Sequence, residues 1–113
     1  MNLGKAITSV RKQLGIKQYE LSEMTGISQT SLSQIETGLK RPSPRTLKKI
    51  SEALQVPDSL LYILGMQDTD VPDSKKAIYG LIFPSIRSLA LQMVTTGDNK
   101  VIAEVESAQE VTA

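Results

Sequence analysis

The sequence predicts an all-α protein, in which five short helices form one small domain and a helical C-terminal segment follows it. Apolar residues recur at intervals of three and four along most of the chain, as they do on one face of an α-helix. Serines, glycines and prolines divide this pattern at points where helices begin and end. The balance of charge also changes sign near residue 65, which indicates two parts with different roles.

The first two helices are expected on either side of Gly15. Apolar residues at helical spacing run through residues 3–14, and Gly15 ends that helix. The second helix is expected over residues 16–25, with Leu21 and Met24 buried. Both helices should therefore face a common core.

The third helix carries most of the functional information. Gly26 supplies the positive φ that a sharp turn between helices needs, and Ser28 then caps the helix. Leu32 and Ile35 are its buried positions. Its other positions bear short polar side chains, namely Gln29, Thr30, Ser31, Ser33 and Gln34. A helix that enters the major groove of DNA must present such compact hydrogen-bonding groups to the base edges.

Two further helices complete the domain. The fourth begins at Ser43 with Pro44 in its first turn, where the missing amide proton costs nothing. Pro57 precedes the fifth, and Gly65 closes the domain. The apolar positions of these helices are Leu47, Ile50, Ala53, Leu54, Leu60, Leu61 and Leu64.

Charge divides the chain at the same boundary. Residues 1–65 carry nine Lys and Arg against five Asp and Glu, a net charge of +4, whereas residues 66–113 carry four against seven, a net charge of −3. A basic part suits phosphate groups, and an acidic part more readily faces protein or solvent. We therefore expect a DNA-binding domain over 1–65, a linker over 66–74 and a helical tail over 75–113.

The tail is expected to contain a long apolar helix over residues 74–95. Pro84 should kink this helix or break it in two near Phe83. After a turn at residues 97–99, a shorter amphipathic helix carrying Val101, Ile102, Val105 and Ala108 is expected to fold back. A dimerisation surface is predicted on the long helix at Ile78, Leu81, Ile82, Leu89 and Met93.

Several separated motifs occur in a characteristic order. They are Arg11 in the first helix, Gln18-x-x-Leu21 in the second, Gly26-x-Ser28 in the turn, Ile35-Glu36-x-Gly38 after the third, Arg41-Pro42, and Leu47-x-x-Ile50 leading into Leu54-x-Val56. On these motifs, residues 10–65 resemble the lambda-repressor-like helix-turn-helix domains, best known from the lambdoid phage repressors and Cro. The resemblance implies the five-helix fold and double-stranded DNA as partner.

The resemblance also implies which side chains meet DNA. Base contacts are assigned to Gln29, Thr30, Ser33 and Gln34. Glutamine matches the adjacent acceptor and donor of adenine, and a threonine methyl group can contact thymine. Backbone contacts are assigned to Gln18, Ser31, Lys40, Arg41 and Arg45, with Gln18 also bracing Gln29. The alternative is that these are ordinary solvated residues, as isolated glutamines and charge clusters usually are.

Two further assignments are structural. Arg11 and Glu36 match positions where the family often places an ion pair between the first helix and the end of the third. Ser22 stands where relatives usually have alanine, and its hydroxyl is expected to bond back to the Gln18 carbonyl.

Composition excludes several classes of protein. The chain has no cysteine and no histidine, so disulfides, thiolate metal sites and the commonest general base are absent. We expect no enzyme activity, no catalytic residues, no metal and no cofactor. The apolar stretch at residues 77–94 is interrupted by Pro84, Ser85, Arg87 and Ser88. These interruptions predict a soluble cytoplasmic protein without a membrane span.

Together these features predict a sequence-specific transcriptional regulator, acting as a dimeric repressor that occupies a promoter. One domain of this kind reads only a half-site, so pairing of two tails is favoured over docking of the tail on its own domain. An antitoxin-like protein is the main alternative, with a tail that binds a protein partner and a domain that autoregulates through DNA. An enzyme's accessory subunit is a third, weaker possibility.

Overall fold

The computed structural model describes residues 1–95, and these contain six α-helices, two short 3-10 helices and no strand. The elements are α1 (Leu3–Gln13), α2 (Gln18–Thr25), α3 (Gln29–Glu36), α4 (Pro44–Leu54), α5 (Asp58–Gly65), η1 (Asp68–Asp70), η2 (Asp73–Lys75) and α6 (Lys76–Thr95). The all-α prediction is confirmed, as is the order of five short helices before a long one. The amphipathic helix expected after residue 97 lies outside the described residues.

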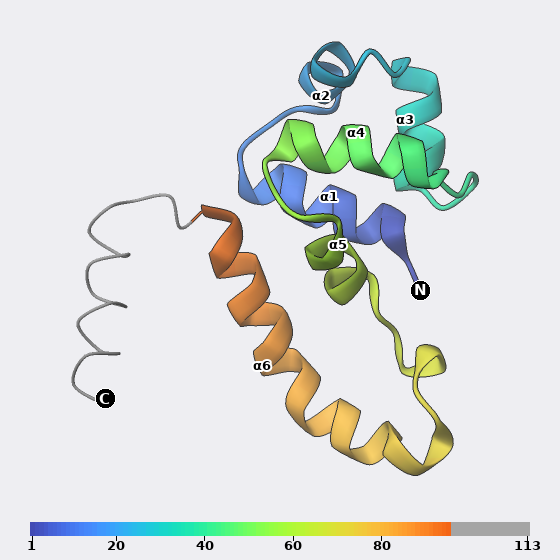
Figure 1. Ribbon diagram of the computed structural model, residues 1–113, viewed down its shortest axis with the longest axis vertical. Coiled ribbons are helices and arrows are strands. Elements are labelled where there is room, and N and C mark those ends of the chain that lie inside the picture. The colour runs from blue at the N-terminus through green and yellow to red at the C-terminus, as the bar shows by residue number, and fades with distance from the viewer. Residues whose placement is uncertain (96–113) are drawn as a thin grey trace, which may run out of the picture.

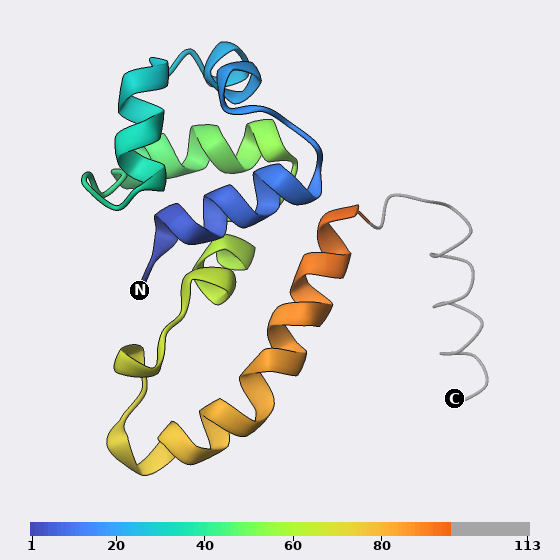
Figure 2. The same cartoon turned by 180° about the vertical axis from the view of Figure 1, so that it is seen from behind.

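Helices α1 to α5 surround one apolar core, which α2 and α3 join from one side and α5 from the other (Figure 1). Helix α6 extends away from α2 and α3, and the view from behind shows the same separation (Figure 2). The largest buried core side chains are Ile7, Val10, Leu21, Leu32, Ile35, Leu47, Ile50, Leu54, Leu61 and Leu64. These positions are the apolar ones expected from the helical spacing.

The predicted caps of α3 and α4 and the predicted turn between α2 and α3 are present. Ser28 Oγ accepts a hydrogen bond from the Ser31 amide at 3.1 Å, and Ser43 Oγ accepts one from the Thr46 amide at 3.1 Å. Gly26 has φ of 73°, which lets the chain turn sharply between α2 and α3. The sequence thus places α3 correctly because caps and turns act over three or four residues.

Helix α2 differs from its prediction in two ways. It begins at Gln18, because the Ile16 carbonyl accepts a hydrogen bond from Arg11 Nη1 at 2.9 Å and the chain is extended at Lys17. Met24 is 53% exposed and not buried. Thr25, four residues after Leu21, is half-buried and occupies the place on the inner face that was assigned to Met24.

The bond predicted for Ser22 is also wrong. Its hydroxyl donates to the Ile27 carbonyl across the turn, and not to the carbonyl of Gln18. The turn at Gly26 folds that carbonyl back over α2, so Ser22 joins the end of α2 to the start of α3. A residue that looked like a neutral replacement therefore stabilises the turn between these helices.

Helix α6 runs without a break from Lys76 to Thr95, so of the two predicted effects of Pro84, a kink or a break near Phe83, the break does not occur. Pro84 lies inside it and removes the bond to the Gly80 carbonyl, and the helix changes direction along its length (Figures 1 and 2). A Cβ at Gly80 would meet no atom within 4 Å.

One side of α6 docks on the first five helices. Arg87 donates from Nη1 to the Leu64 carbonyl at 3.2 Å and from Nη2 to Ser9 Oγ at 3.4 Å. Ala90 is buried, and Leu91 and Val94 contact the core. Docking on its own domain, which the sequence analysis ranked second, is therefore part of what α6 does.

The beginning of α6 is held by aromatic residues. The Tyr79 hydroxyl donates to the Met66 carbonyl at 2.9 Å, and its ring stacks on Phe83 with centroids 4.6 Å apart. Burial raises the pKa of the Tyr79 phenol, and the charges of Asp68 and Asp70 act in the same direction. By length and composition alone, the segment Asp73–Thr95 could cross a membrane, although polar residues interrupt it. Length and composition therefore do not support the prediction that these interruptions exclude a membrane span.

Candidate nucleic-acid interface

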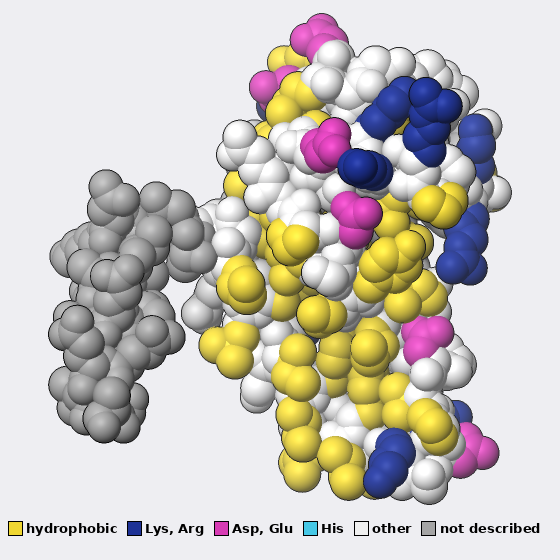
Figure 3. Space-filling view, in the orientation of Figure 1, with side chains coloured by type: hydrophobic (Ala, Val, Ile, Leu, Met, Phe, Trp, Pro, Cys, Tyr) yellow, Lys and Arg dark blue, Asp and Glu magenta, His cyan; other side chains and the backbone are white. Residues whose placement is uncertain are grey.

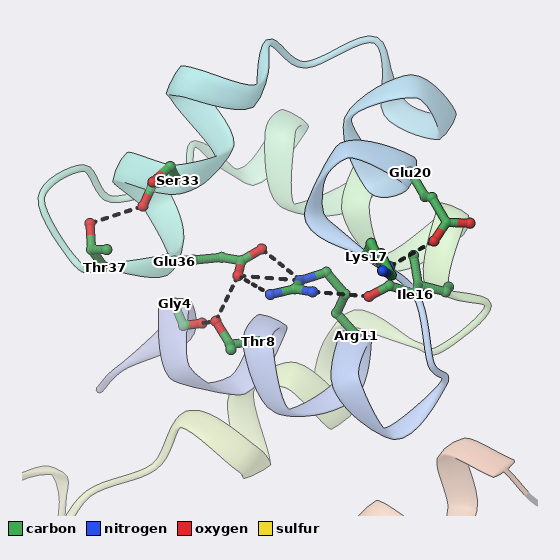
Figure 4. Close-up of polar contacts among 9 residues, drawn as sticks. All are labelled: Gly4, Thr8, Arg11, Ile16, Lys17, Glu20, Ser33, Glu36 and Thr37. Atoms are coloured by element: carbon green, nitrogen blue, oxygen red, sulfur yellow. Dashed lines mark hydrogen bonds and ion pairs between the residues drawn. The ribbon is translucent and has the colours of Figure 1, made fainter.

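Helix α3 presents its polar side to solvent. Leu32 and Ile35 are buried against the core, whereas the side chains of Gln29, Thr30 and Gln34 are exposed. Ser33, the fourth predicted base contact, is half-buried, and its carbonyl accepts from Thr37 Oγ1 at 2.9 Å (Figure 4). Three of the four predicted side chains are therefore free to reach a DNA base from the same helix.

Gln18 lies at the first position of α2 and is half-buried. Among the described residues, no hydrogen bond joins the Gln18 and Gln29 side chains. Its bracing of Gln29 therefore stays a prediction for the DNA complex.

A hollow of about 360 Å³ lies between the start of α3 and the start of α4. Three of the predicted backbone contacts, Ser31, Lys40 and Arg41, line it. Amide groups at helix N-termini carry partial positive charge. The starts of α3 and α4 therefore add positive potential to the charges of Lys40 and Arg41 in this hollow. Arg45 is exposed on α4 but is not part of this lining, and neither is Gln18.

Charge and apolar surface are separated on the face drawn in Figure 3. Lys and Arg side chains gather over the upper part of the molecule, where α3 and α4 lie, and hydrophobic side chains cover much of the lower part. A polyanion would therefore meet the upper part first.

An ion pair holds α3 from beneath. Arg11 Nη2 lies 2.8 Å from Glu36 Oε1, with side-chain exposures of 11% and 5%. Arg11 Nε also donates to Glu36 Oε2 at 3.0 Å, and Thr8 Oγ1 donates to Glu36 Oε1 at 3.0 Å (Figure 4). The structure thus contains the pair that the sequence assigns to these residues, and it adds Thr8, which the sequence analysis did not single out.

Gly4 is a second residue that sequence reasoning missed. A Cβ at this position would lie 2.2 Å from the Ile35 carbonyl oxygen and 2.8 Å from that of Glu36. Only glycine therefore lets α1 approach the end of α3 this closely. A glycine within an otherwise apolar helical face was the available signal.

Four of the five predicted dimerisation residues line two hollows between α5 and α6. Ile78 and Ile82 line a hollow of about 430 Å³ between α5 and α6, and Leu89 and Met93 line a second one of about 270 Å³. Leu81 lines neither and is 80% exposed. Ile63 of α5 and Ile86 of α6 line both hollows, and neither was in the predicted set.

Comparison with known proteins agrees with this architecture. A family model described as helix-turn-helix matches residues 7–61. The ImmF control region 10 kDa protein of Bacillus phage phi105 is 35% identical over 65 residues, which are 58% of this chain and 72% of that protein. The chain belongs to the lambda-repressor-like helix-turn-helix family.

Two other relatives are similar over about half of the chain. An uncharacterised HTH-type transcriptional regulator of Mycobacterium tuberculosis is 38% identical over 60 residues, 53% of this chain and 43% of that protein. Repressor protein C2 of Salmonella phage P22 is 40% identical over 60 residues, 52% of this chain and 28% of its own length. The chain thus spans less than half the length of these two relatives. No solved structure matches it significantly.

Proposed function

We propose that this protein is a sequence-specific DNA-binding transcriptional regulator, which reads a half-site with α3 and acts as a dimeric repressor. The observation that carries the proposal is the exposed row of Gln29, Thr30 and Gln34 on a helix whose other side is buried. Amide and hydroxyl groups of this size fit the base edges of the major groove. The ion pair of Arg11 and Glu36 supports the reading by holding α3 rigidly on α1.

Backbone contacts would come from the cationic hollow beside α3. Ser31, Lys40 and Arg41 face a space that two helix N-termini also border, which suits a phosphate group. Arg45 would add a contact from α4, and Gln18 one from the start of α2. Such contacts position the domain on DNA, and the α3 side chains then supply the specificity.

Dimerisation and repression are the finer parts of the proposal. A single domain of this kind reads only a half-site, and two half-sites about one helical turn apart are needed for useful specific affinity. The phage P22 relative is named a repressor, which favours control by occupancy of a promoter. We place the protein in the cytoplasm, because Arg87 lies in the middle of α6 and bonds to the rest of the protein.

The test is selection of fragmented genomic DNA by the purified protein, followed by sequencing of the bound pool. We expect an inverted repeat with half-site centres about ten base pairs apart. Gln29→Ala should lose discrimination at one base pair per half-site, worth about 1–3 kcal/mol. Gln92→Ala, an exposed glutamine on α6, is the matched control and should select the same sequence as the wild type.

Three outcomes separate the alternatives. Enrichment of one half-site alone would contradict the dimeric operator. If Gln29→Ala keeps every base preference of the wild type, Gln29 takes no part in base recognition. No enrichment at all, together with a stable complex with a small protein encoded next to this one, would favour the antitoxin-like alternative.

A further inference from the structure

An apolar groove runs along the junction of α5 and α6. The two hollows described above share Ile63 and Ile86, so they form one continuous surface. The first hollow is lined by hydrophobic residues alone, and the second adds only Ser59 to such residues. Figure 3 shows the hydrophobic side chains that cover this part of the molecule.

The side chains along the groove follow the spacing of a helix-pairing seam. Ile82, Ile86, Leu89 and Met93 are separated by four, three and four residues. This alternation places side chains in one line along a helix, as in coiled coils and helix bundles. Ile82 is 47%, Ile86 43% and Leu89 62% exposed within the described chain.

We propose that this groove binds α6 of a second copy, so that two α6 helices pair about a two-fold axis with Ile63 of each α5 beside the seam. The inference rests on the proposed function only in that two half-sites require two copies. A surface that meets its own copy must be self-complementary, and an uncharged row of large aliphatic side chains satisfies this condition.

The size of the groove agrees with a second copy. The exposed parts of Ile63 and of the apolar α6 residues along the groove amount to roughly 600 Å² per copy, so a pair that covered all of this surface would bury up to about 1,200 Å², the lower end of stable specific interfaces. Docking of α6 on α1 and α5 orders the helix before pairing, which lowers the entropy that association must overcome.

A lipid bilayer fits α6 less well than a second copy does. A helix that spans lipid is apolar on every side, whereas α6 carries Ser85, Arg87 and Ser88 between its apolar residues. Arg87 and Ala90 also bind α6 to the DNA-reading domain. Insertion into a membrane would break those contacts.

The first experiment is sedimentation equilibrium of the full chain without DNA at micromolar concentration. We expect a dimer. Leu89→Asp and Ile82→Asp should raise the dimer dissociation constant about 100-fold or more, because each places a charge inside the seam. Leu81→Asp is the matched control, since Leu81 is 80% exposed and outside both hollows, and it should change the constant by less than about threefold.

A second experiment uses the absence of cysteine from the chain. Leu89→Cys and Ile86→Cys should each form disulfide-linked dimers under mild oxidation, because residues near a two-fold axis meet their own copies. Leu81→Cys should remain monomeric on a non-reducing gel. Far-UV circular dichroism checks that every variant keeps the helical content of the wild type.

Several results would overturn the inference. They are a wild-type monomer at micromolar concentration, a Leu81 variant that acts like the Leu89 variant, and a monomer that binds phospholipid vesicles through α6. A dimer that selects no DNA would refute the proposed function and leave this inference standing. Sequence-specific binding by a monomer would refute this inference and the dimeric part of the proposed function, and it would leave the assignment of α3 to base recognition standing.

Discussion

At the scale of single residues, two contacts between α1 and α3 decide how α3 is held on the domain. Arg11 brings a positive charge to a carboxylate that is 5% exposed, and Gly4 allows backbone contact a few residues earlier in α1. Neither residue reaches the polar side of α3. Their effect on DNA binding would therefore come through the position and stability of that helix.

Arg11→Ala should destabilise the domain by about 3–5 kcal/mol, because it leaves the buried Glu36 charge without its partner. Urea denaturation followed by circular dichroism measures this. Lys12→Ala, the next cation along α1 and an exposed one, should change stability by less than about 0.5 kcal/mol. An Arg11→Ala protein as stable as the wild type would disprove the structural role.

Gly4→Ala should destabilise the domain by about 1–3 kcal/mol, since the new methyl group would overlap two carbonyl oxygens of α3. Gly80→Ala is the matched control in α6. Its Cβ would enter open space, so it should stabilise the helix by up to about 1 kcal/mol. Thermal unfolding of both variants gives the comparison, and equal effects of the same sign would contradict the close approach at Gly4.

At the scale of elements, α3 and the loop before α4 have different tasks. Helix α3 exposes uncharged polar groups, which we propose discriminate bases, whereas Lys40 and Arg41 carry charge, which we propose attracts any DNA sequence. Their proximity follows from the short connection between α3 and α4 and from the Ser43 cap. Changes in the two elements should therefore have separable effects on binding.

Arg41→Ala should weaken binding to operator and random DNA by a similar factor, because a phosphate contact carries no sequence information. It should also reduce the slope of log affinity against log salt by about one unit. Fluorescence anisotropy over a series of salt concentrations measures both effects. Lys75→Ala, a cation far away in η2, is the control, and an unchanged slope in Arg41→Ala would exclude the phosphate contact.

At the scale of the whole molecule, α6 joins the DNA-reading domain to the proposed dimer seam. Arg87 makes this joint by contacting both the end of α5 and Ser9 of α1. The angle of α6 would then set the distance between two copies of α3. The preferred spacing of half-sites would therefore depend on the contacts of Arg87 as well as on the pairing of the two α6 helices.

Arg87→Met should leave the dimer intact but relax the preference for one half-site spacing, because α6 loses its polar contacts with α1 and α5. Binding to operators lengthened or shortened by one base pair measures this preference. We expect the wild type to lose affinity more steeply than the variant as spacing changes. Ser88→Ala, the exposed neighbour, should behave as the wild type, and identical spacing profiles for all three proteins would refute the role of Arg87.

The sequence alone determined the helices, their caps and the polar side of α3. These features act within a few consecutive residues, so they can be recognised without knowledge of the fold. They are the apolar spacing, the caps at Ser28 and Ser43 and the turn at Gly26. The motifs also predicted the ion pair of Arg11 and Glu36. The family resemblance implies this contact between residues far apart in the sequence, which the spacing of apolar residues does not predict. The predictions for DNA contacts still depend on experiments with DNA.

Only the tertiary structure decided what depends on residues far apart in the chain. Arg11 donates a hydrogen bond to the Ile16 carbonyl, and α2 therefore begins later than predicted. The carbonyl oxygens at the end of α3 lie so close to Gly4 that only glycine fits there. Which side of α6 docks and which stays open also depends on the tertiary structure, because the position of α5 decides it. Local pattern states that a side chain is apolar, and only packing decides which neighbour covers it.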